Sequence, residues 1–211
     1  MCEQAFWPGH NNAAMTTGVD ASNADDLEAV SRVIVSRRTN LRIDRDRPVD
    51  RDLLDRLCGL ATWAPNHKRT VPWRFAIVTG PARRHLGELT AAHLESERTT
   101  DPAALDKTRG KYERAAAVLV IAAHSAGDAT DERRLEDRDA VSAGVQNVLL
   151  AATAAGLNSY WGTGAVTHVP AVKAWCGLEV DDVIVAVLYL GWPVGEVPDP
   201  GRAAPIIRHL G

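Results

Sequence analysis

The sequence has few cysteines and no strong imbalance of charge. Its three cysteines, Cys2, Cys58 and Cys176, lie far apart without a CxxC pair, so neither a metal site nor a disulfide framework is indicated. This usage fits a reducing cytoplasm. The formal net charge of −3 argues against a nucleic-acid partner, because general nucleic-acid binding needs a basic surface that releases counterions from phosphates. A local anion site remains compatible with this charge.

Long apolar runs and targeting signals are also missing. No segment offers 18 consecutive apolar residues, which argues against a membrane-spanning helix. Residues 1–26 lack a basic region followed by an apolar core, so we interpret them as a flexible N-terminal tail and not as a secretory signal. The last residues, IIRHLG, are no prenylation motif. We expect a soluble, cytoplasmic protein without a membrane partner.

Signatures of several common enzyme classes are absent as well. The sequence has no HExxH, P-loop, GxGxxG or GxSxG motif, so zinc protease, NTPase, dinucleotide-binding Rossmann and hydrolase functions lack their hallmarks. The seven histidines are scattered, and a lone histidine is more often a surface or capping residue than a ligand. Only His67 has neighbours that suggest a site.

What the sequence does contain is the composition of one globular domain. The chain has 211 residues, of which 45% are apolar and 24% charged, enough for a single buried core. We assign residues 27–211 to one domain. Its Pro- and Gly-rich end, from Trp192 onward, predicts an extended C-terminal arm that runs over a surface, such as that of a partner subunit.

Three helices are predicted. Residues 25–38 begin with acidic and end with basic residues, as the helix dipole favours, and we expect them to form the first core helix. A second helix follows Pro48, with Asp50 as its N-cap, and ends at Pro65. Residues 139–156 carry small and apolar residues on nearly all sides, which predicts an almost completely buried helix.

Three short apolar runs predict strands. They begin at Trp73, Ala117 and Val183 and read WRFAIVT, AVLVIAA and VIVAVLYLG. Their continuous apolarity indicates burial on both faces. We therefore expect a sheet that is covered by helices on each side.

The loop between the second helix and the first strand has an unusual composition. Residues 61–72 gather Trp, Pro, Asn, His, Lys and Arg, and His67, Lys68 and Arg69 are three successive potential cations. Loops that carry chemistry are often polar, Pro-stiffened segments on a rigid scaffold. We interpret this loop as half of a binding site.

Two further motifs suit a ligand but are ambiguous when taken alone. SRRT at residues 36–39 offers two guanidinium groups and a hydroxyl to a phosphate, whereas a solvated basic helix end is the more common explanation. YWGTG at residues 160–164 has two glycines around Thr163. These glycines let backbone N–H groups approach a planar ligand, and an ordinary turn is the alternative.

In their order along the chain, these segments resemble the nitroreductase family of FMN-dependent oxidoreductases. The resemblance covers about residues 27–195 and includes SRRT, APNHKRTVPWRFAIV, LDKTRGKYERAAAVLVIAA, SAGVQNVLLAATAAGLNSYWGTGAV and VLYLGWPVG. The AP-x-HK-x-x-x-PW-x-F form of the loop and the LDK-x-R stretch are most similar to a compact bacterial subgroup of minimal nitroreductases.

The resemblance implies an α+β fold and a shared cofactor. The expected sheet is mixed, mostly antiparallel and flanked by helices, and two chains would form an intertwined homodimer with two FMN molecules at the interface. Arg37, Arg38 and Thr39 match the family's phosphate-gripping residues. Because each FMN would contact both chains, half of each site is expected on the neighbouring subunit.

The resemblance also assigns residues to the flavin ring. Trp63 and His67 match loop positions that reach the flavin from the neighbouring chain. Trp161–Gly164 matches the segment that lies against the isoalloxazine ring, and the backbone N–H of Thr163 or Gly164 would face flavin N5.

The chain departs from the family pattern at several of these positions. Trp63 and Gly162 stand where close relatives have arginines, and Leu41 stands where many members have a basic residue near the flavin pyrimidine. Arg69 and Val71 replace a common Asn and Gln of the loop. Arg42, Lys68 and Arg69 could compensate for the lost charges, and Arg202 in the C-terminal arm is a further, weaker candidate.

The implied reaction is a ping-pong hydride transfer from NAD(P)H through flavin N5 to an electron-poor small molecule such as a nitroaromatic or a quinone. The cofactor carries this chemistry, so we expect no catalytic side chain. Two alternatives remain open. One is a flavin-destructase-like enzyme that fragments reduced FMN with oxygen, and the other is an FMN-binding or sequestering protein with little turnover, which the lost basic residues suggest.

Overall fold

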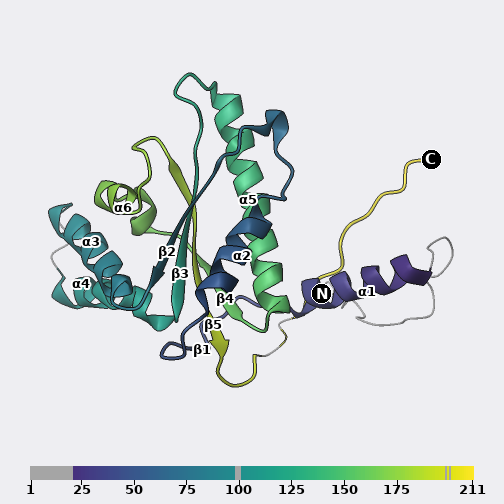
Figure 1. Ribbon diagram of the computed structural model, residues 1–211, viewed down its shortest axis with the longest axis horizontal. Helices are drawn as coiled ribbons and strands as arrows, with labels where there is room; N and C mark the ends of the chain where they lie inside the picture. Colours follow the sequence, from purple (N-terminus) through teal and green to yellow (C-terminus); the bar gives the residue numbers. More distant parts are fainter. Residues whose placement is uncertain (1–20, 98–100, 198, 200) are drawn as a thin grey trace, which may run out of the picture.

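The computed structural model describes residues 21–97, 101–197, 199 and 201–211 (Figure 1). Its helices are α1 (Ala21–Ser36), α2 (Arg51–Ala61), α3 (Ala82–Ser96), α4 (Pro102–Arg109), α5 (Asp131–Ala154) and α6 (Pro170–Trp175), with the short 3-10 helices η1 (His67–Arg69), η2 (Lys111–Arg114) and η3 (Ala165–His168). Its strands are β1 (Ile43–Asp44), β2 (Trp73–Thr79), β3 (Ala117–Ala123), β4 (Asn158–Gly162) and β5 (Val183–Pro193).

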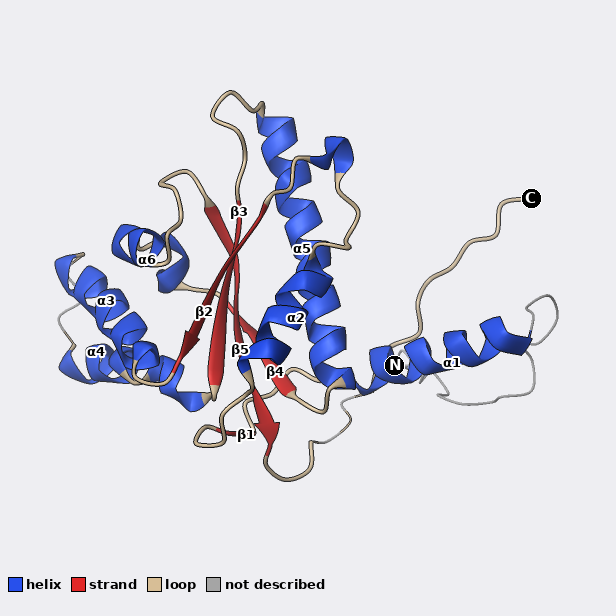
Figure 2. Ribbon diagram, in the orientation of Figure 1, coloured by secondary structure: helices blue, strands red, loops and turns tan. Residues whose placement is uncertain are grey.

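The five strands form one sheet with helices on both sides (Figure 2). The strand order is β1-β5-β3-β2, with β4 also paired to β5, and every strand pair is antiparallel. An isolated parallel bridge joins Thr39 to Ser159. The predicted α+β fold is therefore confirmed, and the three predicted strands begin where the apolar runs begin.

The sheet is buried because β3, all seven residues of which are buried, presents alternate side chains to two apolar clusters. Leu119 and Ile121 belong to the cluster that α2 and α5 cover. Val118 and Val120 belong to the cluster on the other face, with α3 and α6. Figure 1 shows α2 and α5 on one side of the strands and α3, α4 and α6 on the other. This is the two-sided burial that the continuous apolar runs predicted.

Helix α2 begins as predicted and ends earlier. The Asp50 carboxylate accepts hydrogen bonds from the N–H groups of Asp52 at 2.9 Å and Leu53 at 3.4 Å, which confirms this residue as the N-cap. The helix ends at Ala61 and not at Pro65. The Thr62 hydroxyl donates to the Gly59 carbonyl at 2.9 Å, so a helix carbonyl near this end is satisfied by a side chain.

Helix α5 is longer than predicted and is buried on only part of its surface. It begins at Asp131 because Thr130 caps it, accepting a hydrogen bond from the Arg133 N–H at 3.2 Å. Val141, Gly144, Val145 and others face the core, whereas Ala143 and Gln146 are exposed. The predicted burial on nearly all sides is not found in a single chain.

Gly144 sets how closely α5 approaches its neighbours. A Cβ atom at Gly144 would lie 2.7 Å from the Ala61 carbonyl oxygen and 2.7 Å from Trp73 Nε1. We expect Gly144→Ala to lower the free energy of unfolding by about 1–3 kcal/mol, because such overpacking outweighs the higher helix propensity of alanine. Urea unfolding measures this change. Gly59→Ala on α2 is the matched control, since nothing lies within 4 Å of its added Cβ, and an equal loss in both variants would contradict the packing argument.

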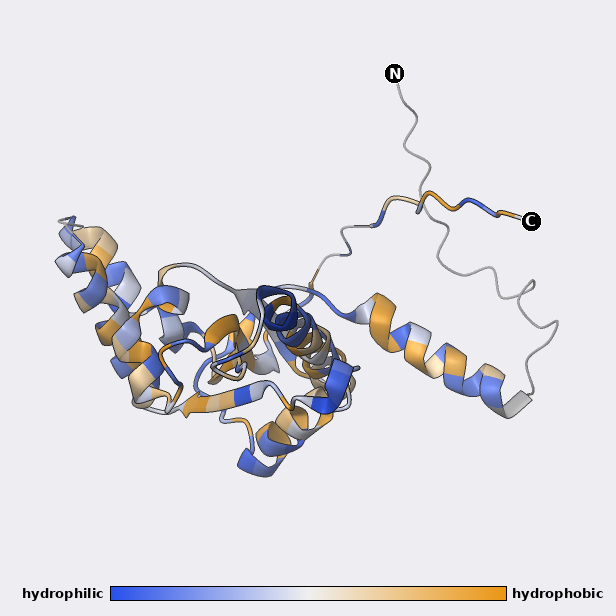
Figure 3. Cartoon of the chain, turned by 90° about the horizontal axis from the view of Figure 1, so that it is seen from above, coloured by the Kyte–Doolittle hydropathy of each residue, from blue (hydrophilic) through white to orange (hydrophobic). Residues whose placement is uncertain are grey.

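Helix α1 is not the core helix that its sequence predicted. Leu27, Val30 and Ile34 are 51%, 54% and 50% exposed. The helix projects from the rest of the chain, and Figure 3 shows apolar positions along its length. α1 begins at Ala21, so residues 21–26 are helical and do not belong to the predicted tail, and residues 1–20 lie outside the described residues. The chain by itself leaves an apolar helix face uncovered.

The C-terminal residues also leave the body of the protein. Residues 204–211 are exposed and contain no helix or strand, and Figure 1 shows them extending away from the sheet. Ile206 and Leu210 are 95% and 94% exposed. The assignment of residues 27–211 to a single domain with such an arm stays a prediction. Within the described residues, no helix has the length and apolarity to cross a membrane.

Candidate functional site

The SRRT segment lies beside β4. Thr39 forms its bridge with Ser159, and the Asn40 N–H donates to the Ser159 carbonyl at 3.0 Å. The Asn158 side chain donates to Asn40 Oδ1 at 3.0 Å. Because β4 continues directly into Thr163, the structure brings together two of the three segments that the sequence assigned to one site.

Arginine side chains gather at this place. Arg37 Nη1 donates to Thr39 Oγ1 at 3.2 Å, and Arg38 Nη2 lies 2.9 Å from a carboxylate oxygen of Asp199. Burial lowers the pKa of Arg37, and the charges of Arg202 and Arg38 lower it further. An anion would relieve this repulsion, so the cluster has the chemistry of a phosphate site.

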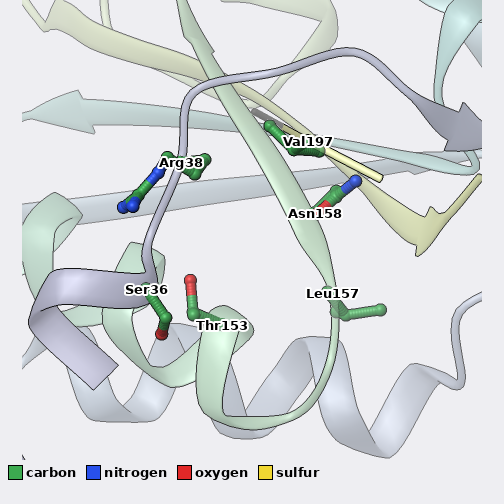
Figure 4. Close-up of a pocket in the computed structure, with 6 residues that line it drawn as sticks. All are labelled: Ser36, Arg38, Thr153, Leu157, Asn158 and Val197. Carbon is green, nitrogen blue, oxygen red and sulfur yellow. The ribbon is translucent and has the colours of Figure 1, made fainter. Parts of the chain in front are cut away.

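A pocket of about 250 Å³ opens next to this cluster (Figure 4). It is lined by Ser36, Arg38, Thr153, Leu157, Asn158 and Val197. Figure 4 shows Arg38 on the segment that follows α1, with Ser36 and Thr153 near it. The pocket therefore lies where the ends of α1 and α5 meet the start of β4.

The end of β4 offers backbone donors. Thr163 and Gly164 are exposed, and neither N–H donates a hydrogen bond to any other described residue. Gly164 has φ 113°, a conformation that side-chain-bearing residues rarely adopt. Trp161 is half-buried, packs against the core and donates from Nε1 to the Val185 carbonyl at 3.3 Å. Two adjacent free N–H groups suit an acceptor atom of a planar ligand.

Gly162 is buried, which is consistent with glycine standing where close relatives have an arginine. A Cβ atom at this position would lie 3.0 Å from Cε2 of Tyr189 and 3.3 Å from Cε1 of Tyr160. The two tyrosine rings pack edge to face, with centroids 5.7 Å apart. A longer side chain at Gly162 would therefore need the tyrosine rings to move.

The loop predicted as half of the site, residues 61–72, contributes no residue to the lining of this pocket. Trp63 is 84% exposed, and His67 Nδ1 lies 3.7 Å from Glu136 Oε1 in the first half of α5. Thr153, which lines the pocket, is at the other end of this helix. At about 1.5 Å per residue, Glu136 and Thr153 are roughly 25 Å apart along the axis. His67 is therefore too far from Thr153 to line the same compact pocket in a single chain.

The loop has an unusual backbone. Lys68, Arg69 and Val71 have φ values of 61°, 54° and 55°, in the left-handed region. This region costs a non-glycine residue roughly 1–2 kcal/mol, and a β-branched residue there is a true outlier. Strain of this kind persists only where surrounding contacts impose it. This conformation is not predictable from the residue types, because none of the three residues is glycine.

The residues that could compensate for the lost charges lie at different places in the structure. Arg202 is close enough to Arg37 to lower its pKa. Arg42 Nη1 instead donates to the Glu196 carbonyl at 2.6 Å, and Lys68 and Arg69 are exposed on the distant loop. The sequence around Arg202 contains no pattern that predicts its effect on Arg37, because this effect depends on where the C-terminal arm lies in the folded chain.

The described cysteines are unsuited to nucleophilic chemistry. Burial raises the pKa of the Cys58 and Cys176 thiols to about 11, so both are protonated at neutral pH. Among the described residues, no three His, Cys, Asp or Glu side chains are placed to hold a metal ion.

The fold and these segments define a protein of the nitroreductase type. Residues 34–192 match the Nitroreductase family. The chain is 30% identical over 177 residues to YdjA of Escherichia coli strain K12, provisionally named an NAD(P)H nitroreductase, and the match covers 80% of this chain and 93% of YdjA. The chain therefore belongs to the nitroreductase family, as its ordered motifs predicted.

Solved structures agree with this assignment. A nitroreductase-like family protein from Bacillus cereus superposes with a TM-score of 0.70 at 29% identity, over 91% of this chain and 95% of that one. A nitroreductase with bound FMN from Bacteroides fragilis superposes with a TM-score of 0.68 at 18% identity, over 86% of this chain and 98% of that one. This second likeness supports the fold.

Proposed function

We propose that this protein is an FMN-dependent oxidoreductase that transfers a hydride from NAD(P)H, through the flavin, to an electron-poor small molecule such as a nitroaromatic or a quinone. The observation that carries the proposal is the Thr39–Ser159 bridge, which sets the arginine cluster beside Trp161–Gly164 in a chain of this family. Bound FMN would supply the redox chemistry, and the protein would orient it.

The residues present suit FMN. Arg37 and Thr39 share a hydrogen bond and have Arg202 nearby, so they would hold the phosphate through charge-assisted hydrogen bonds. The free N–H groups of Thr163 and Gly164 would donate to the flavin ring and stabilise negative charge on it. Arg38 is paired with Asp199, so we assign it a weaker part in phosphate binding than its sequence position implied.

The uncovered face of α1 supports a homodimer. The groove between α1 and α5 is apolar and measures about 250 Å³; it is lined by Ala29, Val30, Val33, Leu150, Ala151 and Ala154. A second copy would cover this groove and the exposed side chains of α1. It would also bring its own loop, with Trp63 and His67, to the arginine cluster from which that loop is separated within one chain. The exposed C-terminal arm would contact the same partner.

Absorption and turnover test the proposed function. After incubation with FMN and removal of free flavin, the protein should retain flavin absorption bands and oxidise NAD(P)H continuously when a quinone is supplied. Permanent bleaching under air would favour the flavin-destructase alternative. Retained flavin without NAD(P)H oxidation would favour sequestration, and an absence of bound flavin would contradict the proposal.

A further inference from the structure

A buried carboxylate anchors the loop between α2 and β2, residues 61–72. Asp137, on α5, is 1% exposed. One of its oxygens accepts a hydrogen bond from the Thr70 hydroxyl, and the other accepts one from the Ser125 hydroxyl at 2.7 Å. Thr70 belongs to the loop before β2, and Ser125 to the segment between β3 and α5. One carboxylate therefore ties two loops to the helix.

The network continues inside the loop. The Asn66 side chain donates from Nδ2 to Thr70 Oγ1 at 3.0 Å, and its Oδ1 accepts a hydrogen bond from the Val71 N–H at 3.0 Å. Thr70 thus accepts from Asn66 and donates to Asp137. Both polar atoms of the Asn66 side chain are engaged within the loop, and Thr70 is its hydrogen-bonded connection to the buried acid.

The strained backbone lies within this network. Lys68 and Arg69 fall between Asn66 and Thr70, and Val71 is the residue whose N–H Asn66 holds. Left-handed residues relax unless surrounding contacts impose their conformation. The hydrogen bonds that begin at Asp137 are such contacts, and they enclose all three left-handed residues.

A purely structural role for Asp137 is the competing explanation. An apolar side chain would fill this position on α5 without the desolvation cost of a carboxylate, so burial alone does not require an acid. The carboxylate adds hydrogen bonds that an apolar side chain cannot make. Its two oxygens hold two hydroxyl donors, one from each of two loops, in fixed positions. The preceding residue, Glu136, also approaches the loop through His67 at 3.7 Å.

We propose that Asp137 is a positioning residue that acts through Thr70. It fixes the strained loop so that Trp63 and His67 are presented in one geometry to the flavin bound by a second copy of the chain. This inference rests on the proposed function, since it assumes that the loop contacts FMN. It adds a residue that touches neither the cofactor nor the substrate.

Thr70 offers a matched pair of variants for the test. Thr70→Val keeps the side-chain shape and removes the hydroxyl, whereas Thr70→Ser keeps the hydroxyl. Because Thr70 is exposed, both variants should fold. We expect Thr70→Val to raise the Kd for FMN about tenfold and to change the visible circular dichroism of bound flavin. Thr70→Ser should stay within about twofold of the unaltered protein.

Three outcomes are decisive for proteins that bind FMN. A higher Kd for FMN in Thr70→Val than in Thr70→Ser supports the inference. Asp137→Asn should then weaken FMN binding less than Thr70→Val does, since the amide oxygen still accepts one hydrogen bond. Unaltered FMN binding in Thr70→Val overturns it. An equal loss in Thr70→Ser also overturns it, because the hydroxyl would then not be the cause.

Hydrogen exchange separates this inference from the proposed function. If the unaltered protein binds no FMN, the proposed function fails, and the role of Asp137 is judged on the cofactor-free protein. The Val71 amide, which donates to Asn66, should then exchange faster in Thr70→Val than in Thr70→Ser. Equal exchange in the two variants would overturn the anchoring role of Asp137 independently of any flavin.

Discussion

Replacing Arg37 with alanine is expected to weaken FMN binding by roughly 10- to 150-fold. Hydrogen bonds from a charged group contribute about 1.5–3 kcal/mol, and each 1.4 kcal/mol is a factor of ten in Kd. Arg37 is the arginine of the cluster that is bonded to Thr39 and has Arg202 nearby. Titrating the variant with FMN and following the quenching of flavin fluorescence measures the change.

Arg84→Ala is the control for this effect. Arg84 is a half-exposed arginine on α3, on the other side of the sheet, with Glu88 at 3.5 Å and Glu113 at 3.4 Å. Exposed ion pairs contribute little to stability, so its loss should leave FMN binding unchanged. If Arg37→Ala binds FMN as well as Arg84→Ala does, SRRT is a solvated helix end.

Replacing Val30 with aspartate is expected to separate the proposed homodimer and, with it, to abolish FMN binding. Val30 lines the apolar groove between α1 and α5 and is 54% exposed in the single chain. Loss of a buried valine costs about 1.5–3 kcal/mol, and a symmetric dimer would lose two. The dimer Kd should therefore rise more than about 100-fold. Light scattering at several concentrations, combined with FMN titration, measures both effects.

Val180→Asp is the matched control, because it makes the same change at a valine that is 78% exposed outside the groove. This residue accepts a hydrogen bond from Lys173 of α6 through its carbonyl, on the face of the sheet away from α1. The control should remain dimeric and bind FMN. A monomeric unaltered protein that retains FMN would contradict the shared site.

Much of the fold follows from local patterns. The apolar runs at Trp73, Ala117 and Val183 form strands of a sheet that is covered on both faces, and their short length and continuous apolarity carry that information. Asp50 caps α2 because the side chain reaches N–H groups two and three residues ahead. β4 was missed because its five residues, NSYWG, contain no apolar run and are strand only through pairing with β5.

The candidate site was only partly accessible to sequence reasoning. The motifs named Arg37, Thr39 and the segment up to Gly164, since residue types in a fixed order mark the family. They gave no sign of Asp137, because it stands in the charged run ERRLEDRD (132–139), which a solvated helix face explains equally well. They also named Arg202 only as a further, weaker candidate, although its charge is one of the causes that lower the pKa of Arg37.

The sequence by itself determined the family, the three long strands and the residue types available for binding a phosphate and a flavin. Only the tertiary structure decided which of these residues meet. It placed the arginine cluster beside β4 and His67 near the other end of α5, and it left the apolar face of α1 uncovered. The physical reason is that local patterns depend on neighbours along the chain, whereas proximity and burial depend on which distant surfaces pack together.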